Sequence, residues 1–96
     1  MTSHFIFYVS NQERATEFYK QALGAEPRFD VPGMTEFDLP GGAVLGLMPE
    51  SGIQQLLGDA VPDPASATGV PRAELYLVLP NPDDFLERAH AAGASP

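Results

Sequence analysis

The chain has 96 residues, of which 44% are hydrophobic, and its 5 basic and 13 acidic side chains give a formal charge of −8. Such a charge repels phosphate backbones and anionic lipid surfaces, so nucleic acid and membranes are not expected partners. The absence of cysteine rules out disulfides and thiolate metal sites. A chain of 96 residues is expected to form one small domain. We expect it to be cytoplasmic, because no apolar run is long enough to cross a bilayer and no secretory signal is visible.

The first predicted elements are a strand and a helix. Residues 4–9 are aromatic and β-branched, which favours a half-buried strand. Ser10 and Glu13 have the spacing of a capping box, and apolar residues then recur at helical spacing. Gly24 is the expected C-terminal stop of this helix.

Two turn signals, Pro32-Gly33 and Pro40-Gly41-Gly42, divide the next part of the chain into short strands. The three strands are expected at roughly 26–31, 34–39 and 43–48. Residues 1–48 are therefore predicted to form one βαβββ module.

Residues 49–72 are rich in Gly, Pro, Ala, Ser and Asp and are predicted to form a linker. A short helix is expected inside it, behind a possible cap at Ser51, because the apolar residues Ile53, Leu56 and Leu57 cluster there. A connection of this length inside a compact domain is usually functional or a junction between units.

The last part of the chain repeats the first. Residues 4–27 align without a gap on residues 73–96, with identical residues at Val9/Val78, Ala22/Ala91, Gly24/Gly93, Ala25/Ala94 and Pro27/Pro96. The repeat predicts a second strand at 73–79 and a second helix from Asp83 to Ala92, with Pro82 in its first turn. Residues 73–96 are thus expected to be the start of a second βαβββ module, limited to its first strand and helix.

This order of elements resembles the vicinal oxygen chelate superfamily, the glyoxalase/bleomycin resistance/dioxygenase group. The most specific part is His4-x4-Val9-x-Asn11 running into Ala15-x2-Phe18-Tyr19-x3-Leu23-Gly24, together with the GGAVLGL run at 41–47. The resemblance implies an α+β fold with strand order 2-3-4-1-5 in a mixed sheet, both helices on one face, and a cup around a small molecule. Relative to that pattern, the last three strands of the second module are missing.

The resemblance also implies positions for metal ligands, on strands one and four and on the first and last strands of the second module. His4 matches the first position, but Gly46 and Ala73 stand at the next two, and the fourth lies on a missing strand. A divalent ion needs roughly three or more protein ligands. We therefore expect no catalytic metal unless a second chain or missing residues supply ligands.

Residues that contact a ligand are predicted from the alternation of side chains along the strands. Phe5, Phe7 and Val9 are expected to pack on the helices. The residues expected to face a ligand in the cup are His4, Ile6, Tyr8, Val44 and Met48. Glu36 and Asp38 share one strand face and are interpreted as solvated, although such a pair could orient a cation or act as acid and base.

Three functions are compatible with these observations. The first is a small-molecule-binding domain that uses no metal, with no assigned catalytic residues. The second is a metal-dependent lyase of the glyoxalase type, or a dioxygenase, with ligands from missing residues or a second chain. The third is an inactive fragment. A homodimer is expected to form through the exposed cup face, since the open edge of residues 73–79 would otherwise be a liability.

Overall fold

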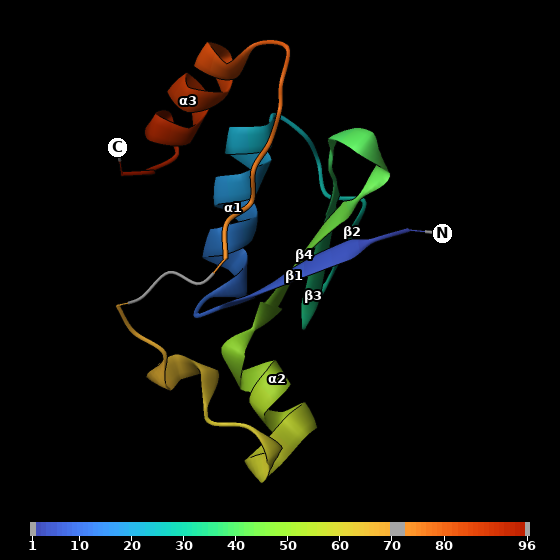
Figure 1. The fold of residues 1–96 in the computed structure, drawn as a ribbon, viewed down its shortest axis with the longest axis vertical. Helices are drawn as coiled ribbons and strands as arrows, with labels where there is room; N and C mark the ends of the chain where they lie inside the picture. The colour runs from blue at the N-terminus through green and yellow to red at the C-terminus, as the bar shows by residue number, and fades with distance from the viewer. Residues whose placement is uncertain (1, 70–72, 96) are drawn as a thin grey trace.

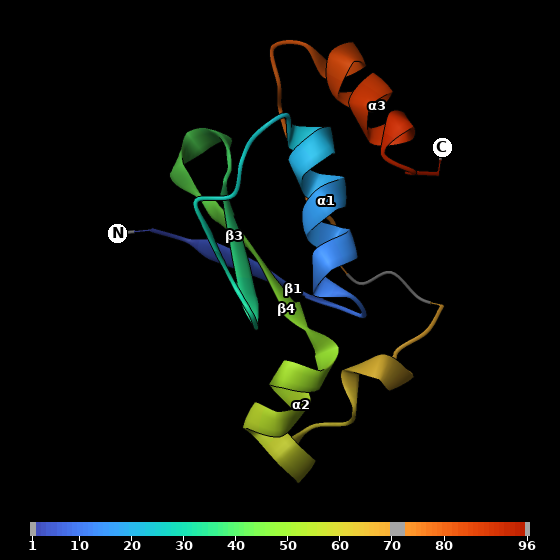
Figure 2. The same cartoon turned by 180° about the vertical axis from the view of Figure 1, so that it is seen from behind.

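The computed structural model describes residues 2–69 and 73–95. A mixed four-stranded sheet lies at its centre, with helices α1 and α3 on one side (Figures 1 and 2). The strands are β1 (His4–Val9), β2 (Phe29–Val31), β3 (Met34–Asp38) and β4 (Val44–Pro49), in the order β1-β4-β3-β2. β1 and β4 are parallel and the other two pairs are antiparallel. The predicted α+β class and the predicted order of these four strands are confirmed.

Helix α1 (Gln12–Leu23) carries the chain from the end of β1 back across the sheet. Its cap is Asn11, whose side-chain oxygen accepts a hydrogen bond from the Arg14 N–H at 3.0 Å. The prediction of Ser10 as the cap is wrong by one residue. Gly24, with φ of 64°, ends the helix as expected, because glycine adopts the left-handed conformation without steric cost.

The Asn11 cap has a measurable consequence. Replacing Asn11 by Ala leaves one helix-end N–H without its acceptor and is expected to lower the free energy of unfolding by about 1 kcal/mol. Ser10→Ala, one residue earlier, is the matched control and should change it by less than about 0.5 kcal/mol. Urea unfolding followed by circular dichroism measures both, and a larger loss in the Ser10 variant would contradict the observed cap.

The hydrophobic core lies between the sheet and α1. Its buried centre consists of Phe37, Leu39, Leu45 and Leu47, and partly buried apolar side chains pack around it. Phe37 of β3 pairs with Leu45 of β4 in the antiparallel register. Because side chains alternate along a strand, Phe37, Leu45 and Leu47 all point to the side of the sheet that α1 covers.

Only part of β1 joins this core. Phe7 and Val9 pack against it as predicted, whereas Phe5 is 53% exposed and does not. The reason is visible in Figure 1, where the start of β1 extends away from α1. The expected packing of Phe5 on a helix is therefore wrong.

The predicted strand at 73–79 is not part of the sheet. These residues are not paired with another strand, and Figure 1 shows them running beside α1 towards α3. Their side chains still alternate, since Leu75 and Leu77 pack on the core while Tyr76 is 81% exposed. The burial of the two leucines holds the segment in place, but no neighbouring strand in the described residues supplies its ladder hydrogen bonds. β1 is consequently the edge strand on this side.

Helix α3 spans Pro82–Ala91, whereas the sequence predicts a helix from 83 to 92. It packs on α1. Arg88 fixes the contact, because its Nε donates a hydrogen bond to the Ala22 carbonyl at the end of α1, at 3.2 Å. No helix in the described part of the chain has the length and apolar character of a membrane span.

Helix α2 (Glu50–Leu57) directly follows β4 and lies at the lower end of the sheet in Figure 1. Pro49 precedes its first turn and no side chain caps it, so the Ser51 cap is not formed. Short 3-10 turns occur at Pro40–Gly42, Gly58–Ala60 and Pro64–Ser66. Ile53 is the buried residue of α2.

Candidate functional site

We call the face of the sheet opposite α1 the open face, although Val44 and Gly46 on it are buried. The parallel register places His4, Ile6 and Tyr8 of β1 beside Val44, Gly46 and Met48 of β4, so these six residues share a face. In both views α1 and α3 lie on the other side, and no helix of the described residues lies across this face (Figures 1 and 2). Ile6 and Tyr8 are accordingly exposed.

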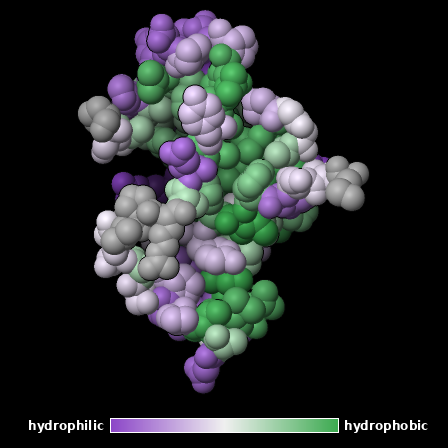
Figure 3. Space-filling view, viewed as in Figure 1, coloured by the Kyte–Doolittle hydropathy of each residue, from purple (hydrophilic) through white to green (hydrophobic). Residues whose placement is uncertain are grey.

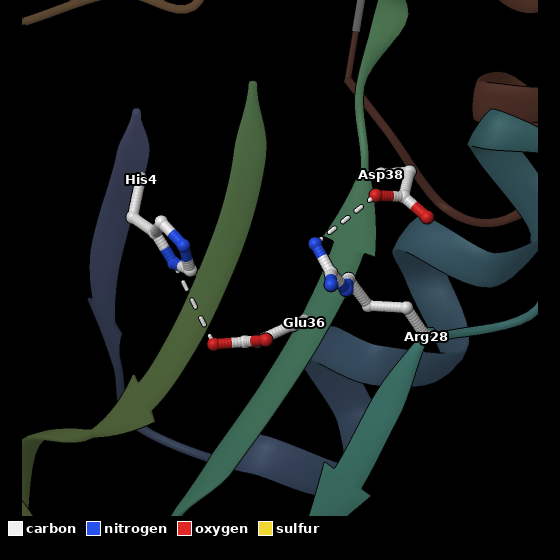
Figure 4. Close-up of polar contacts among 4 residues, drawn as sticks. All are labelled: His4, Arg28, Glu36 and Asp38. Carbon is white, nitrogen blue, oxygen red and sulfur yellow. Dashed lines mark hydrogen bonds and ion pairs between the residues drawn. The ribbon is translucent and has the colours of Figure 1, made fainter. Parts of the chain in front are cut away.

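Two polar contacts between side chains lie at one end of this face (Figure 4). His4 Nδ1 lies 3.6 Å from Glu36 Oε2, and the two side chains meet over β4. Arg28 contacts Asp38 Oδ1 at 3.3 Å. The Asp38 side chain is 73% exposed, as expected for a solvated carboxylate, but that of Glu36 is only 20% exposed. Glu36 is therefore a partly buried partner of His4, and its interpretation as solvated is wrong.

A hollow of about 940 Å³ opens where β1 meets residues 50–68, and we call it the linker hollow. Its strand wall consists of Ile6, Phe7 and Tyr8. Its linker wall includes the apolar residues Ile53, Leu57, Val61, Pro62 and Pro64. The hollow has the volume and the mainly apolar lining of small-molecule sites, which measure roughly 300–1,000 Å³. Figure 3 shows apolar side chains gathered in the middle of the molecule and over α2.

A second hollow, of about 660 Å³, lies between α1 and the end of α3. Phe18 and Tyr19 line it, with their rings edge to face at 5.0 Å between centroids. Burial raises the pKa of Tyr19 above its ordinary value of 10.0, because the phenolate loses hydration there. This hollow is smaller and contains none of the predicted ligand contacts, so we place the candidate site at the linker hollow.

Comparison with known proteins places the chain in a family. The model of the glyoxalase/bleomycin resistance protein/dioxygenase superfamily matches residues 2–95. The chain belongs to this superfamily. A comparison with curated proteins gave no significant match.

Two solved structures share the fold of this superfamily member. One is a glyoxalase-related enzyme from Fulvimarina pelagi, with a TM-score of 0.71 and 24% identity over 97% of this chain. The other is a glyoxalase/bleomycin resistance protein/dioxygenase from Nocardioides, with a TM-score of 0.66 and 25% identity, again over 97% of this chain. The chain spans 65% and 62% of the lengths of these two proteins.

The superfamily's metal ligands can be tested against the residues present. A Cβ at Gly46 would lie 3.2 Å from Ile6 Cγ1 and 3.3 Å from Met34 Sδ, so those side chains occupy the space beside this strand position. His4 and Glu36 offer two donors, but residues 2–69 and 73–95 contain no group of three or more His, Cys, Asp or Glu that could hold a metal ion. The described side chains do not fit a divalent ion.

The five predicted ligand contacts fall into three groups. Ile6 and Tyr8 line the linker hollow, and Met48 lies beside Tyr8 in register and is partly buried. His4 is at the other end of β1, in its pair with Glu36. Val44 is fully buried, and its assignment as a ligand contact stays a prediction.

Sequence reasoning did not assign the linker wall to the site. The available signal was the length of the connection at 49–72 together with its apolar residues Ile53 and Leu57. What was missing was the direction of the linker, which turns back to β1 after α2 and so places residues 61–68 beside Ile6 and Tyr8.

Proposed function

We propose that this superfamily member binds a small molecule in the linker hollow and uses no metal held by its own residues. The observation that carries the proposal is the juxtaposition of Ile6 and Tyr8 with the apolar linker wall around a volume of about 940 Å³. Apolar walls stabilise a bound ligand by about 25 cal/mol for each Å² removed from water, and the Tyr8 hydroxyl adds one polar contact.

The metal-free part of the proposal rests on the donor set. His4 and Glu36 are two donors where a stable divalent site needs about three or more. The packing of Ile6 and Met34 beside Gly46 supports the same conclusion, since a carboxylate there would have to displace them.

The alternative is a metal-dependent lyase or dioxygenase in which a second chain or further residues complete the ligand set. The His4–Glu36 pair favours it to the extent that two donors already lie on the open face. The other alternative is an inactive fragment. The observation behind it is that this chain spans only 65% and 62% of the lengths of the two solved structures.

One titration separates these proposals. The probe is 2-(1-naphthyl)ethanol, whose fluorescence can be followed selectively because the chain has no tryptophan. With EDTA present, we expect saturable binding with a dissociation constant of about 1 mM or lower, from a typical ligand efficiency of about 0.3 kcal/mol per heavy atom. In a parallel titration without EDTA, added Zn²⁺, Ni²⁺ or Fe²⁺ should leave this dissociation constant unchanged. Binding that appears only with metal would favour the alternative enzyme, and no binding in either condition would contradict the proposed function.

A homodimer through the open face stays a prediction, and the surface area supports it. The accessible surface is 7020 Å², whereas a compact monomer of 10.3 kDa has about 5,400 Å². A second copy on the open face would cover part of this excess. Light scattering tests the prediction, and a monomer mass at about 100 μM would contradict a stable dimer, which typically has a lower dissociation constant.

A further inference from the structure

We infer that the linker hollow selects organic cations, meaning an apolar or aromatic body that carries an amine or quaternary ammonium group. The inference rests on the proposed function and adds the charge of the ligand to it. It comes from the side chains that line the hollow, which combine apolar walls with two carboxylates and, among its described lining residues, no basic group.

The two carboxylates among the residues that line the hollow are Glu50 and Asp63. Glu50 opens α2 and is partly buried, and Asp63 precedes the turn at Pro64–Ser66. The Ala65 N–H donates to Asp63 Oδ1 at 2.9 Å, which orients this carboxylate. Neither carboxylate takes part in an ion pair within the described residues. Both are therefore available to a cation in the hollow.

The N-terminus of α2 lies on the same wall and favours an anion, so its charge has to be compared with that of the two carboxylates. The N-terminus of α2 carries a partial positive charge equivalent to roughly half an elementary charge. Glu50 places a full negative charge in this first turn, and Asp63 adds another on the wall. The net local charge is negative, so an anionic ligand is disfavoured.

The strand wall contributes in the same direction. Tyr8 lines the hollow, and an aromatic ring attracts a cation that lies over its face. The chain's formal charge of −8 also raises the local concentration of cations. An amine attached to an apolar body therefore gains contacts on both walls that a neutral or anionic analogue of the same shape lacks.

A matched ligand series tests the inference. The three probes are 2-(1-naphthyl)ethylamine, 2-(1-naphthyl)ethanol and 1-naphthylacetate, which share one ring system and carry a cation, a neutral group and an anion at pH 7. In low salt, we expect the amine to bind roughly tenfold more tightly than the acetate, with the alcohol between them. Raising the salt to about 0.5 M should narrow the range, because exposed charges are screened.

Two double variants distinguish the effect of the carboxylates in the hollow from the effect of the chain's net charge on probe binding. Glu50→Gln with Asp63→Asn removes both carboxylates of the hollow and keeps the Asp63 side-chain acceptor, so the amine and the alcohol should bind within about threefold of each other. Asp83→Asn with Glu87→Gln on exposed positions of α3 makes the same change in net charge and should leave the amine preference in place. Equal binding of all three probes to the unmodified chain, or equal loss of preference in both double variants, would overturn the inference and leave the proposed function standing. Failure of the neutral alcohol to bind would contradict the proposed function itself.

Discussion

Phe37→Ala is expected to lower the free energy of unfolding by about 3–5 kcal/mol. Phe37 is fully buried at the centre of the core and contacts the β4 leucines through its register with Leu45. Its removal leaves a cavity that α1 and the sheet cannot close completely. Since domains of this size have small stability margins, the variant should be partly unfolded at 37 °C.

Phe29→Ala is the matched control for this substitution. Phe29 lies on the neighbouring strand β2, but nearly half of its surface is exposed. Its replacement should cost less than about 1.5 kcal/mol, because less apolar area returns to water on unfolding. Urea unfolding of both variants measures the difference. Equal losses, or a loss below about 1 kcal/mol for Phe37→Ala, would contradict the location of the core.

Ile53→Ala is expected to open the linker hollow. Ile53 is the buried residue of α2 and lines the hollow, so it both attaches the linker to the sheet and shapes the site. The loss of its buried methyl groups should cost about 2–4 kcal/mol. We expect binding of the neutral naphthyl alcohol to weaken at least tenfold, and proteolytic cleavage between residues 50 and 69 to become faster.

Leu56→Ala in the same helix is the control. Leu56 is 72% exposed and does not line the hollow, so its replacement should leave probe binding and the rate of cleavage nearly unchanged. The two variants remove apolar groups of similar size from one helix. A difference between them therefore reports on contacts in the hollow and not on helix propensity. If both weaken binding equally, the ligand does not lie against the buried side of α2.

Much of the fold could be predicted from short-range patterns. The alternation in β1, the helical spacing up to Leu23 and the glycine at position 24 are local features, and the structure has a strand, a helix and a left-handed stop at these places. The absence of strand pairing at residues 73–79 could not be predicted in this way. Alternating side chains show that a segment is extended, but hydrogen bonding to a neighbour depends on where the rest of the chain lies.

Part of the geometry of the candidate site was also predictable from local patterns. Alternation correctly placed Ile6 and Tyr8 on the open face, because that depends only on the strand period. The burial of Val44 and the partnership of His4 with Glu36 depend on residues from three strands, which no pattern within one strand contains. The approach of the linker to β1 is likewise a tertiary feature.

The position of a bound probe tests the proposed site most directly. Uniformly ¹⁵N-labelled protein would be titrated with 2-(1-naphthyl)ethanol, in the presence of EDTA, while backbone amide shifts are followed by NMR. We predict the largest shift changes at Ile6, Tyr8 and Ile53 and at neighbouring residues of the linker hollow. Changes confined to the hollow between α1 and α3, at Arg14 and Phe18, or no saturable changes at all, would contradict a ligand site beside β1.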